Sequence, residues 1–396
     1  MLGLAVEARS AERPELQIIN GTSGPIEVFW LKSDAERVSN GEIEPGGTTL
    51  ITTTIGHRFV IVGDEGAEAV VESVVPVQAF RYQPSAESGA DEAEVVEGEV
   101  IAPPKGAAIP AFYSKYISAG GYPIVGSERV SDYALKEAAH LVNAMLAKRP
   151  DLREAMIQSG SRLCVMAHDE YTTELPEYEF LKRGRAKIDG VDPKDFWDAR
   201  ARGLGGSRAD PYCLSAEENL LGFPGDPFST ENILIHEFAH NIHLRGMANV
   251  DPTFDERLRE TYDKAMAQGL WKKAYASVNR HEYFAEGVQS WFDNNRENDN
   301  EHNHVNTRAE LLEYDPDLAA LCREVFGDTV LVYTKPATRL TGHLEGYDPS
   351  RAPRFVWPSR LKKAQAEIRR EVRERNQKQD APSASVGAAS HQRGAH

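Results

Sequence analysis

Cysteine is scarce in this sequence, which contains only three in 396 residues. The three residues, Cys164, Cys213 and Cys322, lie far apart, and none has the CxxC spacing of a cysteine zinc site. This scarcity excludes a dense disulfide framework. It leaves open a single bridge with one thiol left over.

Long apolar runs and an excess of basic residues are also missing. No apolar run approaches the roughly 20 residues that a membrane helix needs, so we expect no membrane partner. The 61 acidic residues outnumber the 45 basic ones, which gives a formal net charge of −16. This charge disfavours nucleic acid and anionic membranes as partners and favours neutral or basic ones.

The length of the chain predicts a multidomain protein, and residues 14–83 have the pattern of an all-β domain. Short β-rich runs alternate there with turn signals such as Asn20-Gly21 and Gly63-Asp64. The expected strands cover residues 17–20, 26–31, 48–54, 58–62 and 69–77. Several short strands at this close spacing predict a small β-sandwich.

Two segments of this domain, IINGTSGPIEVFWL (18–31) and EIEPGGTTLITTTIGHRFVI (42–61), resemble the β-domain of the von Hippel-Lindau tumour suppressor family. The Asn-Gly-Thr turn, the Trp30-Leu31 pair and Gly56-His57 carry the resemblance. In that family the β-domain binds a peptide segment of a partner. The resemblance therefore implies docking of a protein or peptide on the β-sandwich, and a purely structural role stays open.

The composition changes after the β-sandwich. Residues 84–108 are acidic, small and proline-flanked, as in a linker. A mainly helical α+β domain is expected over 109–355, with helices at 131–148 and 151–158, a strand at 162–167, and mostly helices and long loops thereafter. A charged helix at 356–378 and a disordered tail at 379–396 complete the expected organisation.

The segment NILIHEFAHNIH (232–243) predicts a buried helix, because apolar residues recur along it and it contains no Pro or Gly. His236 and His240 are four residues apart, so both imidazoles project from one face and can bind one ion. Glu237 lies about 100° round the helix, where it can contact a water on that ion. We therefore expect one Zn²⁺ per chain, with Glu237 as general base. The alternative is an ordinary buried helix whose histidines are satisfied by hydrogen bonds.

A third protein ligand would decide between these interpretations. The metzincin pattern needs glycine three residues and histidine six residues after the second histidine, but His243 and Gly246 stand there. Further along, HEYFAEGVQSWFD (281–293) places Glu282 and Glu286 on one face of a predicted helix. Two carboxylates on an apolar helix need a cation or hydrogen bonds to neutralise them. A zinc ion with its histidines would do so.

The segment YASVNRHEYFAEGVQ (275–289) resembles the active site of gluzincin zinc metallopeptidases of the anthrax lethal factor type. The resemblance implies that Tyr275 stabilises the oxyanion, Glu282 is the third zinc ligand and Glu286 supports a ligating histidine. It also implies a gluzincin (zincin-like) fold for the second domain. The expected function is hydrolysis of peptide bonds in a peptide or protein substrate by a zinc-activated water that Glu237 deprotonates.

Four further histidines are weaker candidates. His243 is expected to pack or hydrogen-bond beside the ligands rather than bind the metal, because three ligands from so short a stretch of helix would distort a tetrahedral site. His281 points away from Glu282 and is expected at the surface or in a hydrogen bond. His302 and His304 lie in a polar loop that either lines the cleft or simply faces solvent.

Two other functions stay open at this point. One is a non-catalytic zinc-containing binding or adhesion protein that uses its β-sandwich, and the other is a hydrolase of a non-protein amide. The compartment is also undetermined. The hazard of a free endopeptidase in cytosol favours secretion or the periplasm.

Overall fold

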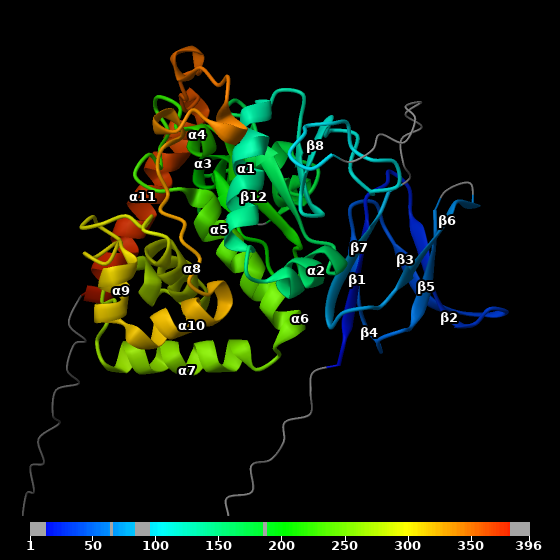
Figure 1. Cartoon of the computed structure of the whole chain (residues 1–396). Coiled ribbons are helices and arrows are strands. Elements are labelled where there is room, and N and C mark those ends of the chain that lie inside the picture. The colour runs from blue at the N-terminus through cyan, green and yellow to red at the C-terminus, as the bar shows by residue number, and fades with distance from the viewer. Residues whose placement is uncertain (1–12, 64–65, 84–95, 185–187, 381–396) are drawn as a thin grey trace, which may run out of the picture.

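A computed structural model describes residues 13–63, 66–83, 96–184 and 188–380 of the chain (Figure 1). Two β-sheets at the N-terminus, one mixed and one antiparallel and neither of them closed, are followed by a largely helical α+β region. The first part of the expected linker and nearly all of the expected tail lie outside the described residues.

The two N-terminal sheets share one hydrophobic core. The mixed sheet has the strand order β4-β1-β7, in which β1 and β7 run parallel, and the antiparallel sheet has the order β3-β2-β5-β6. Leu16, Val28 and Ile61 are among the buried side chains between them. The strands are β1 (Glu15–Asn20), β2 (Ile26–Ser33), β3 (Glu36–Ile43), β4 (Thr48–Thr52), β5 (Arg58–Val62), β6 (Glu68–Glu72) and β7 (Val77–Tyr82).

A five-stranded sheet organises the second region, with the order β11-β12-β10-β9-β8. Its three inner strands run parallel, and the edge strands β8 and β11 are antiparallel to their neighbours. All side chains of the central strand are buried, and they alternate between two hydrophobic cores, as the pleat requires. The strands are β8 (Lys115–Ala119), β9 (Tyr122–Gly126), β10 (Arg162–Met166), β11 (Gly203–Leu204) and β12 (Tyr212–Ala216).

Helices cover one face of this sheet, where the larger hydrophobic core lies between its strands and α1, α5 and α8, and loop and 3₁₀ segments that include Tyr113 and Tyr178 pack on the other face. A π-helical turn, Ile242–Met247, continues α5 into α6. The helices are α1 (Asp132–Met145), α2 (Pro150–Gln158), α3 (Pro193–Arg200), α4 (Glu217–Leu221), α5 (Ile233–Asn241), α6 (Ala248–Val250), α7 (Phe254–Ala267), α8 (Arg280–Trp291), α9 (Arg308–Tyr314), α10 (Pro316–Phe326) and α11 (Ser359–Asp380).

The N-terminal sheets lie at one side of the helical region and contact it through β1 and β7 (Figure 1). The Gln17 side-chain amide donates to the Ala209 carbonyl oxygen over 2.8 Å. The Val77 N–H donates to the side-chain oxygen of Asn249 over 2.6 Å, and that side chain returns a bond to the Val77 carbonyl. The mixed sheet is thereby tied to α6 and to the loop that connects β11 to β12.

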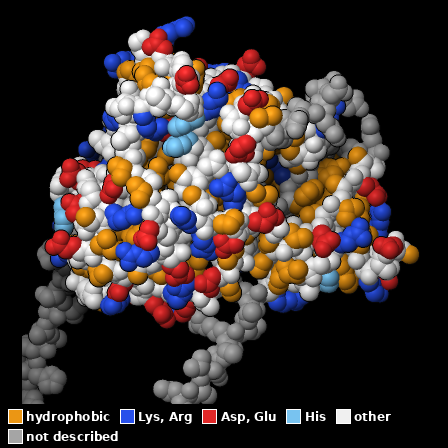
Figure 2. Space-filling view, viewed as in Figure 1, with side chains coloured by type: hydrophobic (Ala, Val, Ile, Leu, Met, Phe, Trp, Pro, Cys, Tyr) orange, Lys and Arg blue, Asp and Glu red, His pale blue; other side chains and the backbone are white. Residues whose placement is uncertain are grey.

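The structure also bears on the cysteines, on membrane-spanning helices and on the distribution of surface charge. All three cysteines are buried and free, so the bridge that the sequence left open does not form. In the described part of the chain, no helix combines the length and the apolar character that crossing a membrane requires. On the face shown in Figure 2, acidic and basic side chains are interspersed rather than separated into large fields.

Candidate metal centre

Helix α5 presents two histidines from a buried position. Its N-cap is Asn232, whose side-chain oxygen accepts a bond from the Ile235 N–H and satisfies one of the free donors of the first turn. The apolar side chains of the helix, Phe238 among them, are buried in the larger core. His236 and His240 therefore emerge together on the face that borders the cleft.

Helix α8 carries the third residue of the group, Glu282. The Asn279 side chain caps this helix by accepting bonds from the N–H groups of His281 and Glu282, over 2.8 and 3.1 Å. This cap fixes the first turn, where Glu282 lies, and the following turns are buried through Phe284 and Val288. Helix α8 packs directly on α5, so the two segments meet although more than thirty residues separate them.

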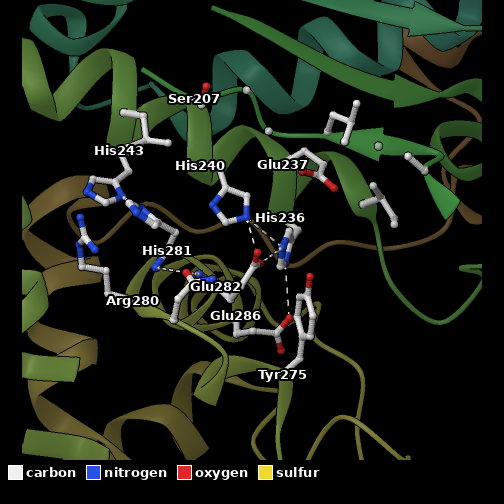
Figure 3. A pocket seen from close by; sticks show the side chains of 18 of the residues that line it. Ser207, His236, Glu237, His240, His243, Tyr275, Arg280, His281, Glu282 and Glu286 are labelled. Carbon is white, nitrogen blue, oxygen red and sulfur yellow. Dashed lines mark hydrogen bonds and ion pairs between the residues drawn. The ribbon is translucent and has the colours of Figure 1, made fainter. Parts of the chain in front are cut away.

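His236, His240 and Glu282 form a group that could hold a metal ion (Figure 3). Glu282 Oε2 lies 3.1 Å from His236 Nε2 and 3.2 Å from His240 Nε2, and the two nitrogens are 3.2 Å apart. Zinc bonds to nitrogen and oxygen of about 2.0–2.1 Å in tetrahedral geometry place neighbouring ligand atoms about 3.3 Å apart. The observed triangle therefore fits three ligands of one ion.

The tautomer of His236 supports the same interpretation. Gln289 donates its amide N–H to Glu231 over 2.8 Å, which turns its oxygen toward His236 Nδ1, 2.9 Å away. His236 Nδ1 then carries a proton, and Nε2 faces the carboxylate of Glu282, 3.1 Å away. At that distance a proton or a metal ion must lie between the two atoms. Burial alone would lower the pKa of His236, but the bonds with Glu282 and Glu286 outweigh it and raise the pKa well above its ordinary value, and a metal ion bound here would take the place of that proton.

Glu286 lies behind the metal group and is almost completely buried. Its carboxylate is 3.4 Å from His236 Nδ1, accepts a bond from the Asn295 amide over 3.1 Å, and is 3.3 Å from His302 Nε2. Burial alone would raise the pKa of Glu286, but the bonds from the two histidines outweigh it and lower the pKa to about 2. Glu286 is thus an anion that stabilises positive charge on the His236 ring.

The support of His236 differs in one respect from the sequence prediction. Glu286 was expected to accept the bond from the free ring nitrogen of a ligating histidine. In the structure Gln289 makes the shorter contact to that nitrogen, and Glu286 lies beside it. Gln289 and Glu286 therefore both lie at His236 Nδ1, where Glu286 alone was expected.

Glu237 lines the cleft. None of the described residues forms a hydrogen bond or an ion pair with that carboxylate, and Figure 3 shows it beside the metal group. Burial raises the pKa of Glu237 to about 7, and the positive charge of His236 opposes part of this rise. A carboxylate with such a pKa can both take and return a proton near neutral pH.

Tyr275 lies on the other side of His236, in the short 3₁₀ turn Tyr275–Ser277. Its ring centroid is 6.2 Å from that of His236, and Figure 3 shows its hydroxyl pointing toward the space between His236 and Glu237. Burial, reinforced by the Glu282 carboxylate, raises the pKa of Tyr275 to about 12. The phenol is therefore protonated at neutral pH and can donate a hydrogen bond.

A cleft of about 760 Å³ contains these groups and is bordered by the edge strand β11. Two glycines allow this strand to approach α5 closely. A Cβ added to Gly203 would lie 2.9 Å from Glu237 Cγ, and one added to Gly205, just after the strand, would lie 2.7 Å from His240 Cδ2 and 2.8 Å from the Glu237 carbonyl oxygen. Gly203 and Gly205 thus let this part of the chain pack directly on α5, with no side chain of their own between the two.

We expect Gly205→Ala to destabilise the protein by about 1–3 kcal/mol, because the added methyl overlaps a helix backbone and a ligand ring that cannot yield easily. Thermal unfolding and zinc content measure the effect, and both should fall. Gly184→Ala is the matched control, since its Cβ would meet only the Leu181 carbonyl oxygen at an ordinary 3.5 Å. Equal stability of the two variants would contradict the close packing.

A second group with metal-ligand chemistry, His243, Asp255 and His281, lies next to the first. His243 Nε2 is 3.1 Å from Asp255 Oδ1, and the Nδ1 atoms of His243 and His281 are 3.4 Å apart. Arg280 donates to both oxygens of Asp255, over 2.9 and 3.0 Å. The bond with His243 and, after it, the bonds from Arg280 keep the pKa of that carboxyl well below its usual range. Because Arg280 already supplies the cation, this group is an ion-pair network that joins α7 to α8.

The two histidines of the loop after α8, His302 and His304, lie in different environments. His302 lines the cleft, bonds toward Glu286 and is nearly buried, so it belongs to the surroundings of the metal group. His304 packs edge-on against Tyr314, away from the site. The part played by His302 could not be derived from the loop sequence, because it depends on where the loop folds back on α8.

The chain matches no protein-family model and no curated protein sequence. The assignment of a function therefore depends on the geometry and the chemistry of the site itself.

Proposed function

We propose that this protein is a zinc-dependent peptidase of the gluzincin type, with a zincin-like catalytic region similar to that of anthrax lethal factor. The proposal rests on the triangle of His236, His240 and Glu282, beside which the carboxylate of Glu237, without a hydrogen bond or ion pair from the described residues, lines an open cleft. Zinc bound there would polarise a scissile carbonyl and lower the pKa of an attacking water.

Each residue around that position has a task in hydrolysis. Glu237 takes a proton from the attacking water and passes it to the leaving amine. Gln289 and Glu286 keep the proton of His236 on Nδ1, so that Nε2 remains free to ligate. The phenol of Tyr275 donates a hydrogen bond to the oxyanion as its charge develops.

The edge strand favours a peptide over a small amide as the substrate. Among the described residues, strand β11 pairs with β12 alone, and its residues Gly203 and Leu204 border the cleft. An unpaired strand edge offers N–H and C=O groups that an extended peptide can bond as an added strand. A peptide held in this way lies across the front of α5.

The N-terminal sheets can contribute to substrate docking in this proposal. They hold the loop after β11 through the bond from Gln17 to Ala209 and the ion pair of Glu15 with Arg208, 3.6 Å apart. A long protein substrate that leaves the cleft along this loop passes the mixed sheet. We therefore propose peptide or protein docking there as an accessory to cleavage.

Proteome-wide cleavage profiling tests the proposed function. Purified zinc-loaded protein should produce new peptide termini that disappear after chelation and return with zinc. A protein that binds zinc but generates no new termini in native or denatured proteomes would sink the peptidase proposal. It would favour the non-catalytic binding function.

We expect Tyr275→Phe to lower kcat by about 10²-fold or more, the effect of losing one oxyanion donor, while zinc content stays unchanged. The ring remains, so its packing against His236 is preserved. Tyr82→Phe is a suitable control, because that hydroxyl bonds the Ala67 carbonyl in the N-terminal sheets, outside the cleft. Full turnover in the Tyr275→Phe variant would remove the phenol from the mechanism.

A further inference from the structure

The cleft is lined by five arginines, and one of them differs from the rest. Four pair with carboxylates: Arg202 with Glu218, Arg208 with Glu15, Arg280 with Asp255 and Arg296 with Glu231. The fifth, Arg200, is exposed, and no described residue forms a hydrogen bond or an ion pair with it. The wall of the cleft therefore presents one guanidinium whose hydrogen-bond donors are not used by the described part of the protein.

The backbone that bears Arg200 is firmly held. Two residues earlier in α3, the buried carboxylate of Asp198 accepts bonds from the N–H and the hydroxyl of Thr173, over 3.0 and 2.9 Å. Two residues later, the buried guanidinium of Arg202 bonds Glu218 over 2.5 and 2.8 Å. Anchors on both sides fix where the backbone of Arg200 borders the cleft, while its exposed side chain is ordered only when a ligand binds it.

Arg200 lines the same cleft as Glu237 and Tyr275. Three residues further along the chain, Gly203 packs against Glu237, where an added Cβ would lie 2.9 Å from Glu237 Cγ. A substrate placed between Glu237 and Tyr275 therefore shares the cleft with this guanidinium. A matching negative charge on the substrate would supply the partner that the described residues do not.

We propose that Arg200 determines specificity by binding a carboxylate of the substrate close to the scissile bond, an inference that rests on the proposed peptidase function. The planar guanidinium matches a carboxylate in two parallel hydrogen bonds. The carboxylate is either the side chain of Asp or Glu or the C-terminus of the substrate. This local preference runs against the net charge of −16, which by itself repels acidic peptides.

Cleavage of two randomised peptide libraries separates the two sources of the carboxylate. In the library with acetylated and amidated ends, a preference for Asp or Glu near the cleaved bond identifies a side chain. In the library with free C-termini, cleavage at a constant distance from the end identifies the terminal carboxylate. We expect the wild type to prefer the carboxylate over its amide by about 10- to 100-fold in kcat/KM.

Charge reversal gives the decisive comparison. Arg200→Glu should invert the preference, so that Lys or Arg replaces the acidic residue, and Arg200→Lys should keep a weaker acidic preference. Arg259→Glu is the matched control, because it makes the same change of net charge on α7, where Arg259 forms ion pairs with Glu256 and Asp263. An equal loss of kcat/KM on all peptides in Arg200→Glu would show an action through Glu237 and overturn the specificity role.

Peptide binding to the zinc-loaded Glu237→Gln variant, followed by fluorescence anisotropy, distinguishes failure of this inference from failure of the proposed function. Tighter binding of carboxylate than of amide peptides, reversed by Arg200→Glu, supports the role of Arg200 even when no cleavage occurs. Absence of that discrimination overturns it, whether or not the wild type cleaves peptides.

Discussion

Glu237→Gln is expected to retain zinc and to lose peptide hydrolysis by about 10²- to 10⁴-fold, the usual contribution of a general base. Glutamine has nearly the same shape as glutamate, so the helix should fold unchanged. Because the carboxylate has no partner among the described residues, its replacement breaks no bond that the structure shows. The substitution removes only the carboxylate beside the metal triangle, a proton acceptor whose pKa burial raises to about 7.

Three measurements on the same preparation make this prediction specific. Zinc content by mass spectrometry should equal that of the wild type, thermal unfolding should be similar, and the rate on a cleaved peptide should fall. Glu313→Gln, an exposed substitution on α9, serves as the control for an identical chemical change. Wild-type rates in Glu237→Gln would show that another group takes the proton.

Glu282→Ala is expected to weaken zinc binding by more than the roughly 10- to 100-fold that loss of an outer hydrogen-bond partner costs, because it removes a ligand itself. The two imidazoles that remain leave the ion with too few protein ligands for a catalytic zinc site. The carboxylate oxygen within 3.2 Å of both ring nitrogens is the atom removed. Hydrolysis should fall with the zinc occupancy.

Glu286→Gln on the same helix provides the comparison. Glu286 contacts the far nitrogen of His236 rather than the converging one, so its neutralisation should cost about 10- to 100-fold in affinity. Competition with a chelator of known affinity measures both variants on one scale. The opposite order, with Glu286→Gln the weaker binder, would reverse the two assignments.

The sequence was most informative about groups whose positions a single helix determines. His236, Glu237 and His240 share one helix, and Glu282 and Glu286 share another, so fixed spacing predicts which side chains lie on one face. Spacing along a helix does not, however, decide which side chain bonds His236 Nδ1. Gln289 lies on the same helix as Glu286, and the choice between them depends on the tertiary bond from Gln289 to Glu231.

Strands were harder to predict than helices. Strand β3 was not expected, because all its side chains except Ile43 are exposed and it has no apolar alternation. Strands β8, β9 and β12 lie in a region that was expected to consist of helices and loops. Buried strands such as β12, with every side chain inside, appear as short apolar runs that resemble buried helix.

The net charge of the chain did not predict the local charge in the cleft. The net charge of −16 favours neutral or basic partners, and it was the guide to partner charge that the sequence offered. Arg200 could not be singled out among the basic residues, because its distinction is the absence of a partner among the described residues in three dimensions. Specificity in this cleft is therefore a prediction of the structure, and composition points the other way.

Anomalous diffraction from crystals of the zinc-loaded protein at the zinc absorption edge would locate the metal itself. One strong peak per chain is expected, about 2.0–2.2 Å from Nε2 of His236, Nε2 of His240 and a carboxylate oxygen of Glu282. A peak bound by His243, Asp255 and His281 instead, or no peak between α5 and α8, would contradict the assignment of these three ligands.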